Sequence, residues 1–130
     1  MRKQYHSRSV GSDTYIWDVD KLVTAAASLE VRRVPVTDVA EINENWWYQD
    51  DQMIPTPKAI AAHMRLVLEA DLQYPIILCA QGRLMDGMHR VVKSLIQNKP
   101  DIRVVRFDVT PPHDFVNVAL DSLPYPAGET

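Results

Sequence analysis

The apolar residues of this chain follow two patterns, short uninterrupted runs and stripes at helical spacing. The run PIILCA at residues 75–80 is typical of a buried strand, and IRVVRFDV at 102–109 predicts another strand. Three stripes with spacings of three and four predict amphipathic helices. The stripes consist of Val19, Leu22, Val23 and Ala26; of Ile60, Met64, Val67 and Leu68; and of Met88, Val91, Val92, Leu95 and Ile96.

Capping residues indicate where the predicted helices begin. Asp18 precedes the first stripe, and Thr56 followed by proline precedes the second, a good cap before a preset first helical residue. Asp38, with Glu41 three residues on, predicts a further short helix through a variant of the capping box. Shorter strands are predicted at 14–17, 31–36 and 83–85.

The order of these elements predicts a single α/β (α+β) domain over residues 13–115, with a mixed sheet flanked by helices. A chain of 130 residues suits one domain with a modest core. We expect residues 1–12 to be a flexible arm and residues 116–130 a C-terminal tail. The strand at 31–36 contains a proline, which favours an edge or irregular position. Residues 43–55 lack a clear period and predict an aromatic loop, long enough to act as a lid.

Composition narrows the functional classes. The chain has a single cysteine, Cys79, and therefore no internal disulfide, which favours the cytoplasm. The N-terminus is polar and basic, unlike a secretory signal, and no apolar run is long enough to cross a membrane. The sequence has no metal-cage motif. A net charge of −3 argues against broad nucleic-acid binding.

The run DGMHR at residues 86–90 stands between the apolar strand and the last helical stripe. Asp86 is placed to cap the helix, and Gly87 would let a ligand approach the backbone. His89, Arg90 and Lys93 lie three or four residues apart and can converge. Helix N-terminal amides beside these cations predict an anion site, and phosphate suits arginine best. The alternative is a cap, a tight turn and a solvated basic face. Against it, cations at a helix start oppose the helix dipole.

Residues 74–109, and above all GRLMDGMHR, resemble the nucleotide-binding core of the ParB/sulfiredoxin superfamily. The resemblance implies that the turn holds nucleotide phosphates, through Gly87, Met88, His89 and Arg90, with Lys93 as a further candidate. Sulfiredoxins have a catalytic cysteine where this chain has Met88, so sulfinic-acid reduction is not expected. A DNA-binding domain, as in full-length partition proteins, is not expected either.

The DGxHR motif is nearest to the free-serine kinase branch of that superfamily. That resemblance implies that Asp86 activates a substrate hydroxyl, with Glu41 or Glu44 assisting. ATP or a related nucleotide would be the cofactor, and Mg²⁺ would bridge its phosphates rather than occupy a protein cage. The role of Asp86 as a simple cap stays open.

Aromatic and histidine side chains outside the motif have two interpretations each. Trp46, Trp47 and Tyr48 either anchor the loop or stack on a base, and we assign Trp47 to the nucleotide. His63 is interpreted as a hydrogen-bonded structural residue.

Three functions remain open. The first is nucleotide binding, with phosphoryl transfer to a small hydroxyl substrate or nucleotide hydrolysis as its activity. The second is a non-catalytic module that responds to a nucleotide and binds a protein partner. The third is a nucleic-acid accessory protein, against which the acidic balance argues.

Overall fold

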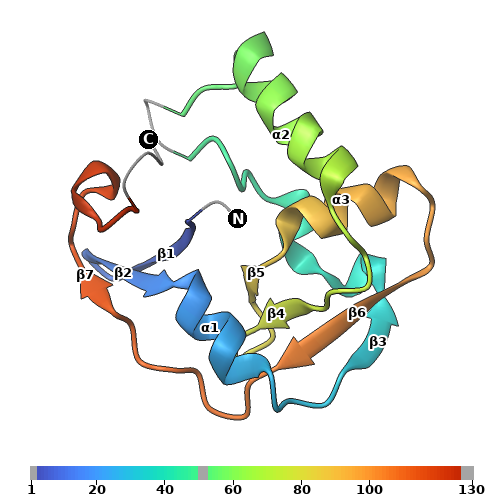
Figure 1. Cartoon of the computed structure of the whole chain (residues 1–130), viewed down its shortest axis with the longest axis horizontal. Helices are drawn as coiled ribbons and strands as arrows, with labels where there is room; N and C mark the ends of the chain where they lie inside the picture. The colour runs from blue at the N-terminus through green and yellow to red at the C-terminus, as the bar shows by residue number, and fades with distance from the viewer. Residues whose placement is uncertain (1–2, 50–52, 127–130) are drawn as a thin grey trace.

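The computed structural model describes residues 3–49 and 53–126 and has mixed helix and sheet content, as predicted (Figure 1). The α-helices are α1 (Val19–Ala26), α2 (Pro57–Glu69) and α3 (Met88–Ile96). The strands are β1 (Tyr5–Val10), β2 (Asp13–Asp18), β3 (Arg32–Pro35), β4 (Ile76–Leu78), β5 (Leu84–Asp86), β6 (Asp101–Arg106) and β7 (Phe115–Val116). Short 3-10 turns are formed by Val36–Asp38, Ala40–Asn43 and Leu120–Ser122.

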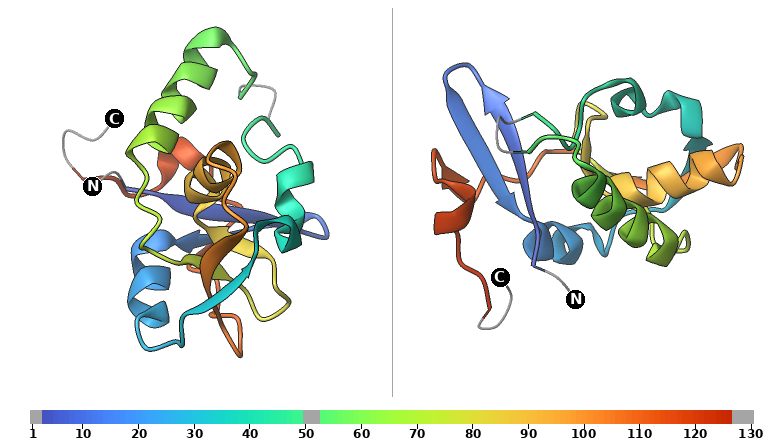
Figure 2. Two further views of the ribbon diagram at one scale, coloured as in Figure 1. Left: turned by 90° about the vertical axis from the view of Figure 1, so that its right-hand side faces the viewer. Right: turned by 90° about the horizontal axis from the view of Figure 1, so that it is seen from above.

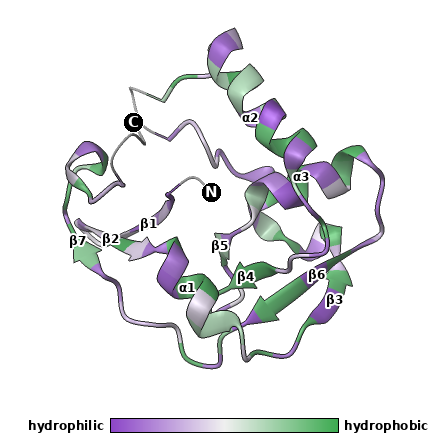
Figure 3. Cartoon of the chain, in the orientation of Figure 1, coloured by the Kyte–Doolittle hydropathy of each residue, from purple (hydrophilic) through white to green (hydrophobic). Residues whose placement is uncertain are grey.

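A four-stranded sheet in the order β3-β6-β4-β5 forms the centre of the fold. β4 and β6 are parallel, while β3 and β5 pair antiparallel with their neighbours. β4 is apolar throughout (Figure 3), and β6 contributes Ile102, Val104 and Val105 to the hydrophobic clusters that lie on the two faces of the sheet. Ile77 belongs to the cluster with Leu22 of α1, and Ile76 to the cluster with Val91 of α3. Since neighbouring strand residues point to opposite faces, α1 and α3 cover opposite faces of this sheet.

The N-terminal arm was predicted wrongly for residues 5–10, which form β1. β1 pairs with β2 in a hairpin, with Val10 opposite Asp13, and β2 also pairs with β7. Gly11 adopts φ +62° in the two-residue turn, a conformation typical of glycine in tight hairpins. The Gly-Ser pair just before the predicted strand at 14–17 is a sequence signal for this hairpin.

Two helix caps are confirmed. Asp18 accepts a hydrogen bond from Asp20 N at 3.0 Å, and the Thr56 hydroxyl accepts one from Ala59 N at 3.1 Å. The third cap is wrong, because residues 36–43 form two 3-10 turns without side-chain capping bonds.

The stripes predicted the helices better than they predicted burial. In α2 only Val67 is buried, and Ile60, Met64 and Leu68 are exposed. α2 packs beside α3, away from the sheet (Figure 2), so most of its apolar residues have no partner surface. Val23 of α1 and Leu95 and Ile96 of α3 are exposed as well.

The C-terminal segment is partly packed. It contributes β7 and a 3-10 turn, and the Leu123 side chain is buried. Residues 127–130 of the predicted tail lie outside the described residues. Within the described part of the chain, no helix is long and apolar enough to span a membrane.

Candidate functional site

The DGMHR turn joins β5 to α3, as the sequence predicted. Asp86 ends β5, Gly87 is the N-cap of α3 with φ +118°, and no side chain makes a capping hydrogen bond. The predicted cap by Asp86 is therefore wrong. Its carboxylate instead accepts a hydrogen bond from Arg90 Nη2 at 3.0 Å, one helical turn on. Arg90 Nη2 also lies 3.3 Å from the Pro75 carbonyl oxygen, and the Arg90 Nε is buried without a hydrogen bond.

Gly87 is required by the fold itself. A Cβ at this position would lie 2.6 Å from Ile76 Cγ2 and 2.9 Å from Arg90 Nη2, closer than real contacts allow. Its positive φ also favours glycine. The close neighbours on that side of Gly87 are thus the chain's own atoms, rather than an open approach for a ligand.

His89 belongs to a group of rings from three separate segments, in which His63 contacts all the others. His89 Nε2 lies 2.9 Å from His63 Nδ1 of α2. The Trp47 ring is nearly parallel to both imidazoles, with centroid distances of 4.1 Å to His63 and 5.0 Å to His89. Tyr48 meets His63 edge-on. The hydrogen bond predicted for His63 is confirmed, and the structure adds its position beside the motif.

Lys93 binds the C-terminal end of α2. Its ammonium lies 3.0 Å from the Leu68 carbonyl oxygen and 2.6 Å from that of Ala70. Carbonyls at a helix C-terminus lack intrahelical partners and favour a cation. Lys93 therefore ties the end of α2 to α3.

The two candidate glutamates share one arginine. Arg83 donates to both Glu44 oxygens at 2.8 Å, and these hydrogen bonds lower the pKa of Glu44. Arg83 Nη1 is also 3.0 Å from Glu41 Oε2, but the geometry is not that of a hydrogen bond. Glu41 is only 1% exposed, and neither of its oxygens has a hydrogen-bond partner.

His6, to which the sequence assigned no role, is buried beside this group. Its ring stacks on Trp46, with centroids 5.9 Å apart, and lies tilted against Trp17, with centroids 5.6 Å apart. Burial, together with Arg8 and Arg83, lowers the pKa of His6 to about 3. The imidazole is therefore neutral at neutral pH. The sequence signal for its burial is the Gly-Ser turn, because a hairpin at this turn places His6 opposite Trp17.

Four of the predicted site residues line one cavity of about 180 Å³ between the loop at 41–48 and α3. They are Glu41, Glu44, Trp47 and Met88. His89 is connected to this cavity through Trp47, on which it stacks. The structure thus brings the two glutamates, Trp47 and the start of α3 together, while Lys93 binds elsewhere.

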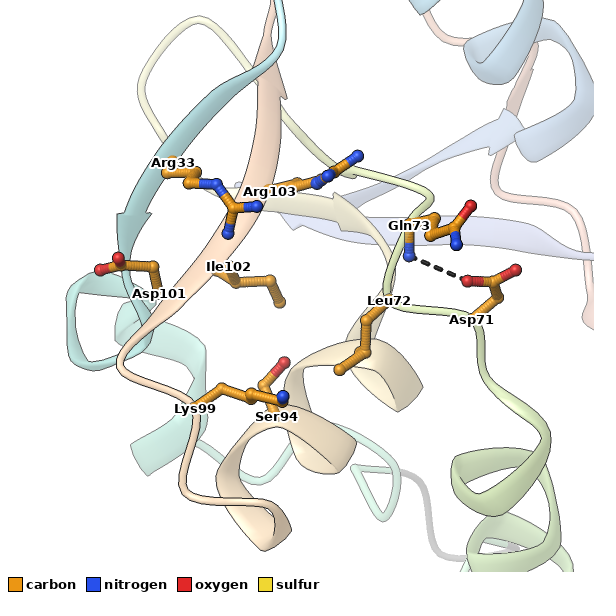
Figure 4. A pocket seen from close by; sticks show the side chains of 9 residues that line it. All are labelled: Arg33, Asp71, Leu72, Gln73, Ser94, Lys99, Asp101, Ile102 and Arg103. Carbon is orange, nitrogen blue, oxygen red and sulfur yellow. Dashed lines mark hydrogen bonds between the residues drawn. The ribbon is translucent and has the colours of Figure 1, made fainter.

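A larger cavity of about 260 Å³ lies apart from the motif, between β3, β6 and the end of α3 (Figure 4). Arg33, Arg103 and Lys99 line it together with Asp71 and Asp101. The Asp71 carboxylate accepts from Gln73 N at 2.9 Å (Figure 4). This larger cavity is thus lined by side chains of both charges, and none of the predicted site residues lines it.

No group of three or more His, Cys, Asp or Glu side chains is placed to hold a metal ion in the described ranges 3–49 and 53–126.

Fold and site define a small α+β domain with a strand–glycine–helix turn that lies beside an aromatic cavity containing a buried carboxylate. Comparisons with family models, curated proteins and solved structures find no match for this chain.

Proposed function

We propose that this domain binds a nucleotide, or a related phosphorylated small molecule, at the start of α3. The observation that carries the proposal is the convergence of His89, His63 and Trp47 on the first helical turn. The amides of residues 88–90 precede the first intrahelical bond, from Val91 N to the Gly87 carbonyl oxygen. Such amides attract anions. The two imidazoles can donate to phosphate, and the indole offers a stacking plane for a base.

The resemblance to the ParB/sulfiredoxin superfamily supports the same placement and is itself part of the proposal. The order β4, β5, α3, β6 agrees with it. We also keep the cytoplasm as the proposed location, because Cys79 is a buried free thiol.

Phosphoryl transfer is the activity that the arrangement would serve, with ATP and Mg²⁺ as cofactors. Arg90 already binds Asp86 Oδ2, so a substrate hydroxyl would have to reach the other oxygen, Oδ1. The Asp86–Arg90 pair also favours the second candidate, a non-catalytic module whose binding of a nucleotide controls a protein partner. A carboxylate bound to an arginine serves as a structural element in such a module.

The binding test is a titration with ATP, with and without Mg²⁺, followed by calorimetry and by melting temperature. A ligand of the folded state raises the melting temperature by mass action. His89→Ala removes a charged-ligand hydrogen bond worth about 1.5–3 kcal/mol, so affinity should fall by about ten- to a hundredfold. His113→Ala is the matched control, since His113 also stacks on an aromatic ring, Tyr15, at 4.0 Å.

Equal affinities of His89→Ala and wild type would contradict the placement of the phosphates. Asp86→Asn separates the two candidate functions. Loss of ATP turnover with binding retained supports phosphoryl transfer, and binding by wild type without turnover supports the non-catalytic module.

A further inference from the structure

The cavity beside the motif has an unusual wall composition. Its lining is mostly apolar and aromatic and includes two glutamates. The residues are Glu41, Ile42, Glu44, Asn45, Trp46, Trp47, Tyr48, Met88, Val92 and Leu95. At about 180 Å³ it is smaller than the cavities of roughly 300 Å³ or more that hold drug-sized ligands. It therefore suits a ligand of few heavy atoms.

Glu41 lines this cavity with both carboxylate oxygens unsatisfied. The side chain is 1% exposed, so its oxygens are closed to bulk solvent, and a ligand in the cavity reaches them only when a lining side chain moves aside. Arg83 lies within ion-pair distance of Glu41 at 3.0 Å but makes no hydrogen bond to it, and buried carboxylate oxygens without hydrogen bonds cost free energy. A ligand that donates hydrogen bonds to Glu41 would remove that cost.

The charges around the cavity point to a positive ligand. Arg83 is the only described cation within ion-pair distance of Glu41 or Glu44, and it serves both. His6, which stacks on Trp46, is neutral at neutral pH and supplies no positive charge. Arg8 contacts His6 rather than either glutamate. Counted as carboxylates, the two glutamates leave this group one negative charge in excess.

We propose that this cavity binds a small primary amine, whose ammonium group donates hydrogen bonds to Glu41. An ammonium carries three donors and matches the two empty oxygens, which a quaternary ammonium cannot do. Trp46, Trp47 and Tyr48 line the same cavity, and aromatic rings attract positive charge. The apolar residues Val92 and Leu95 receive a short alkyl chain. The inference goes beyond the phosphate site and does not depend on it.

The test uses the full chain and n-butylammonium chloride as the probe, against sodium chloride at the same ionic strength. Wild type should show a saturable rise in melting temperature and a calorimetric binding isotherm. Glu41→Gln should lose both, with affinity reduced at least tenfold. Glu30→Gln makes the same charge change on the surface, where Glu30 pairs with Arg32, and should bind as wild type does.

Two further probes sharpen the assignment. Tetramethylammonium has no N–H donor and should bind more weakly than n-butylammonium. Nα-acetyl-lysine amide presents the amine of a protein side chain, and a response above that of n-butylammonium would identify a protein lysine as the natural source. A weaker response would identify a free amine.

The proposal is overturned if wild type responds to the amine no more than to sodium chloride. It is also overturned if Glu41→Gln folds and binds the amine as wild type does, or if tetramethylammonium binds better than n-butylammonium. Glu41→Gln should fold, because it removes a buried charge while Arg83 keeps its two bonds to Glu44.

Discussion

The carboxylate in the motif turn and the one buried beside the neighbouring cavity differ in their hydrogen bonding. Asp86 is partly exposed and accepts a hydrogen bond from Arg90, one helical turn away on the same chain segment. Glu41 is fully buried, and its nearest cation, Arg83, gives its hydrogen bonds to Glu44 instead. Asp86, the carboxylate within the motif, thus has a hydrogen-bond donor within the protein. Glu41, the carboxylate outside the motif, has none, and a ligand would supply it.

The largest expected effect concerns the turn. Gly87→Ala should lower the free energy of unfolding by about 2–4 kcal/mol, through left-handed backbone strain and overlap with Ile76. Gly11→Ala is the control, because Gly11 also has positive φ but nothing within 4 Å of a Cβ. It should cost about 1 kcal/mol. Urea unfolding followed by circular dichroism measures both, and equal losses would contradict the steric role of Ile76.

A second prediction concerns the neutral His6 beside the cavity. Its pKa is about 3 in the folded protein and about 6.5 in the unfolded chain. The unfolded state therefore binds more protons between these values, and folded-state stability is lost as pH falls from 6.5 toward 3. The slope contributed is about 1.4 kcal/mol per pH unit within that window.

His6→Phe should flatten this dependence while keeping the ring contacts with Trp46 and Trp17. Urea unfolding at pH 7, 6, 5 and 4 measures the change in slope. A His6→Phe curve parallel to that of wild type would show that His6 protonates in the folded state, and that the cavity gains a cation in acid.

The smallest effect compares the two carboxylates directly. Asp86→Asn weakens the bond to Arg90 and should lower the free energy of unfolding by about 1 kcal/mol. Glu41→Gln relieves a buried charge and should raise it by about 1 kcal/mol. Melting temperatures measured without ligand show whether each substitution stabilises or destabilises the protein. Two losses of similar size would mean that Glu41 is as well satisfied as Asp86.

Features that depend on neighbours in the sequence were predicted well. The caps by Asp18 and Thr56 are confirmed because each hydroxyl or carboxylate bonds an amide two or three residues on. A strand within 75–80 and the helix predicted to start near Asp86 are also found, as Ile76–Leu78 and Met88–Ile96. β1 was missed because its residues are mostly polar, so its strand character comes from pairing with β2.

Burial was predicted poorly wherever a helix has no covering surface. The stripe of α2 is apolar at Ile60, Met64 and Leu68, yet those residues are exposed. Periodicity identifies the apolar side of a helix, but another element must be packed there to bury it.

The sequence alone determined the starts of α1 and α2, the glycine turn and the set of charged groups next to it, since these follow from short-range sterics and hydrogen bonding. Only the tertiary structure decided which of those groups meet. It placed His63 against His89 and Arg83 against Glu41, residues 26 and 42 positions apart. Such distances are set by the packing of the sheet and helices, because no local preference extends that far along a chain.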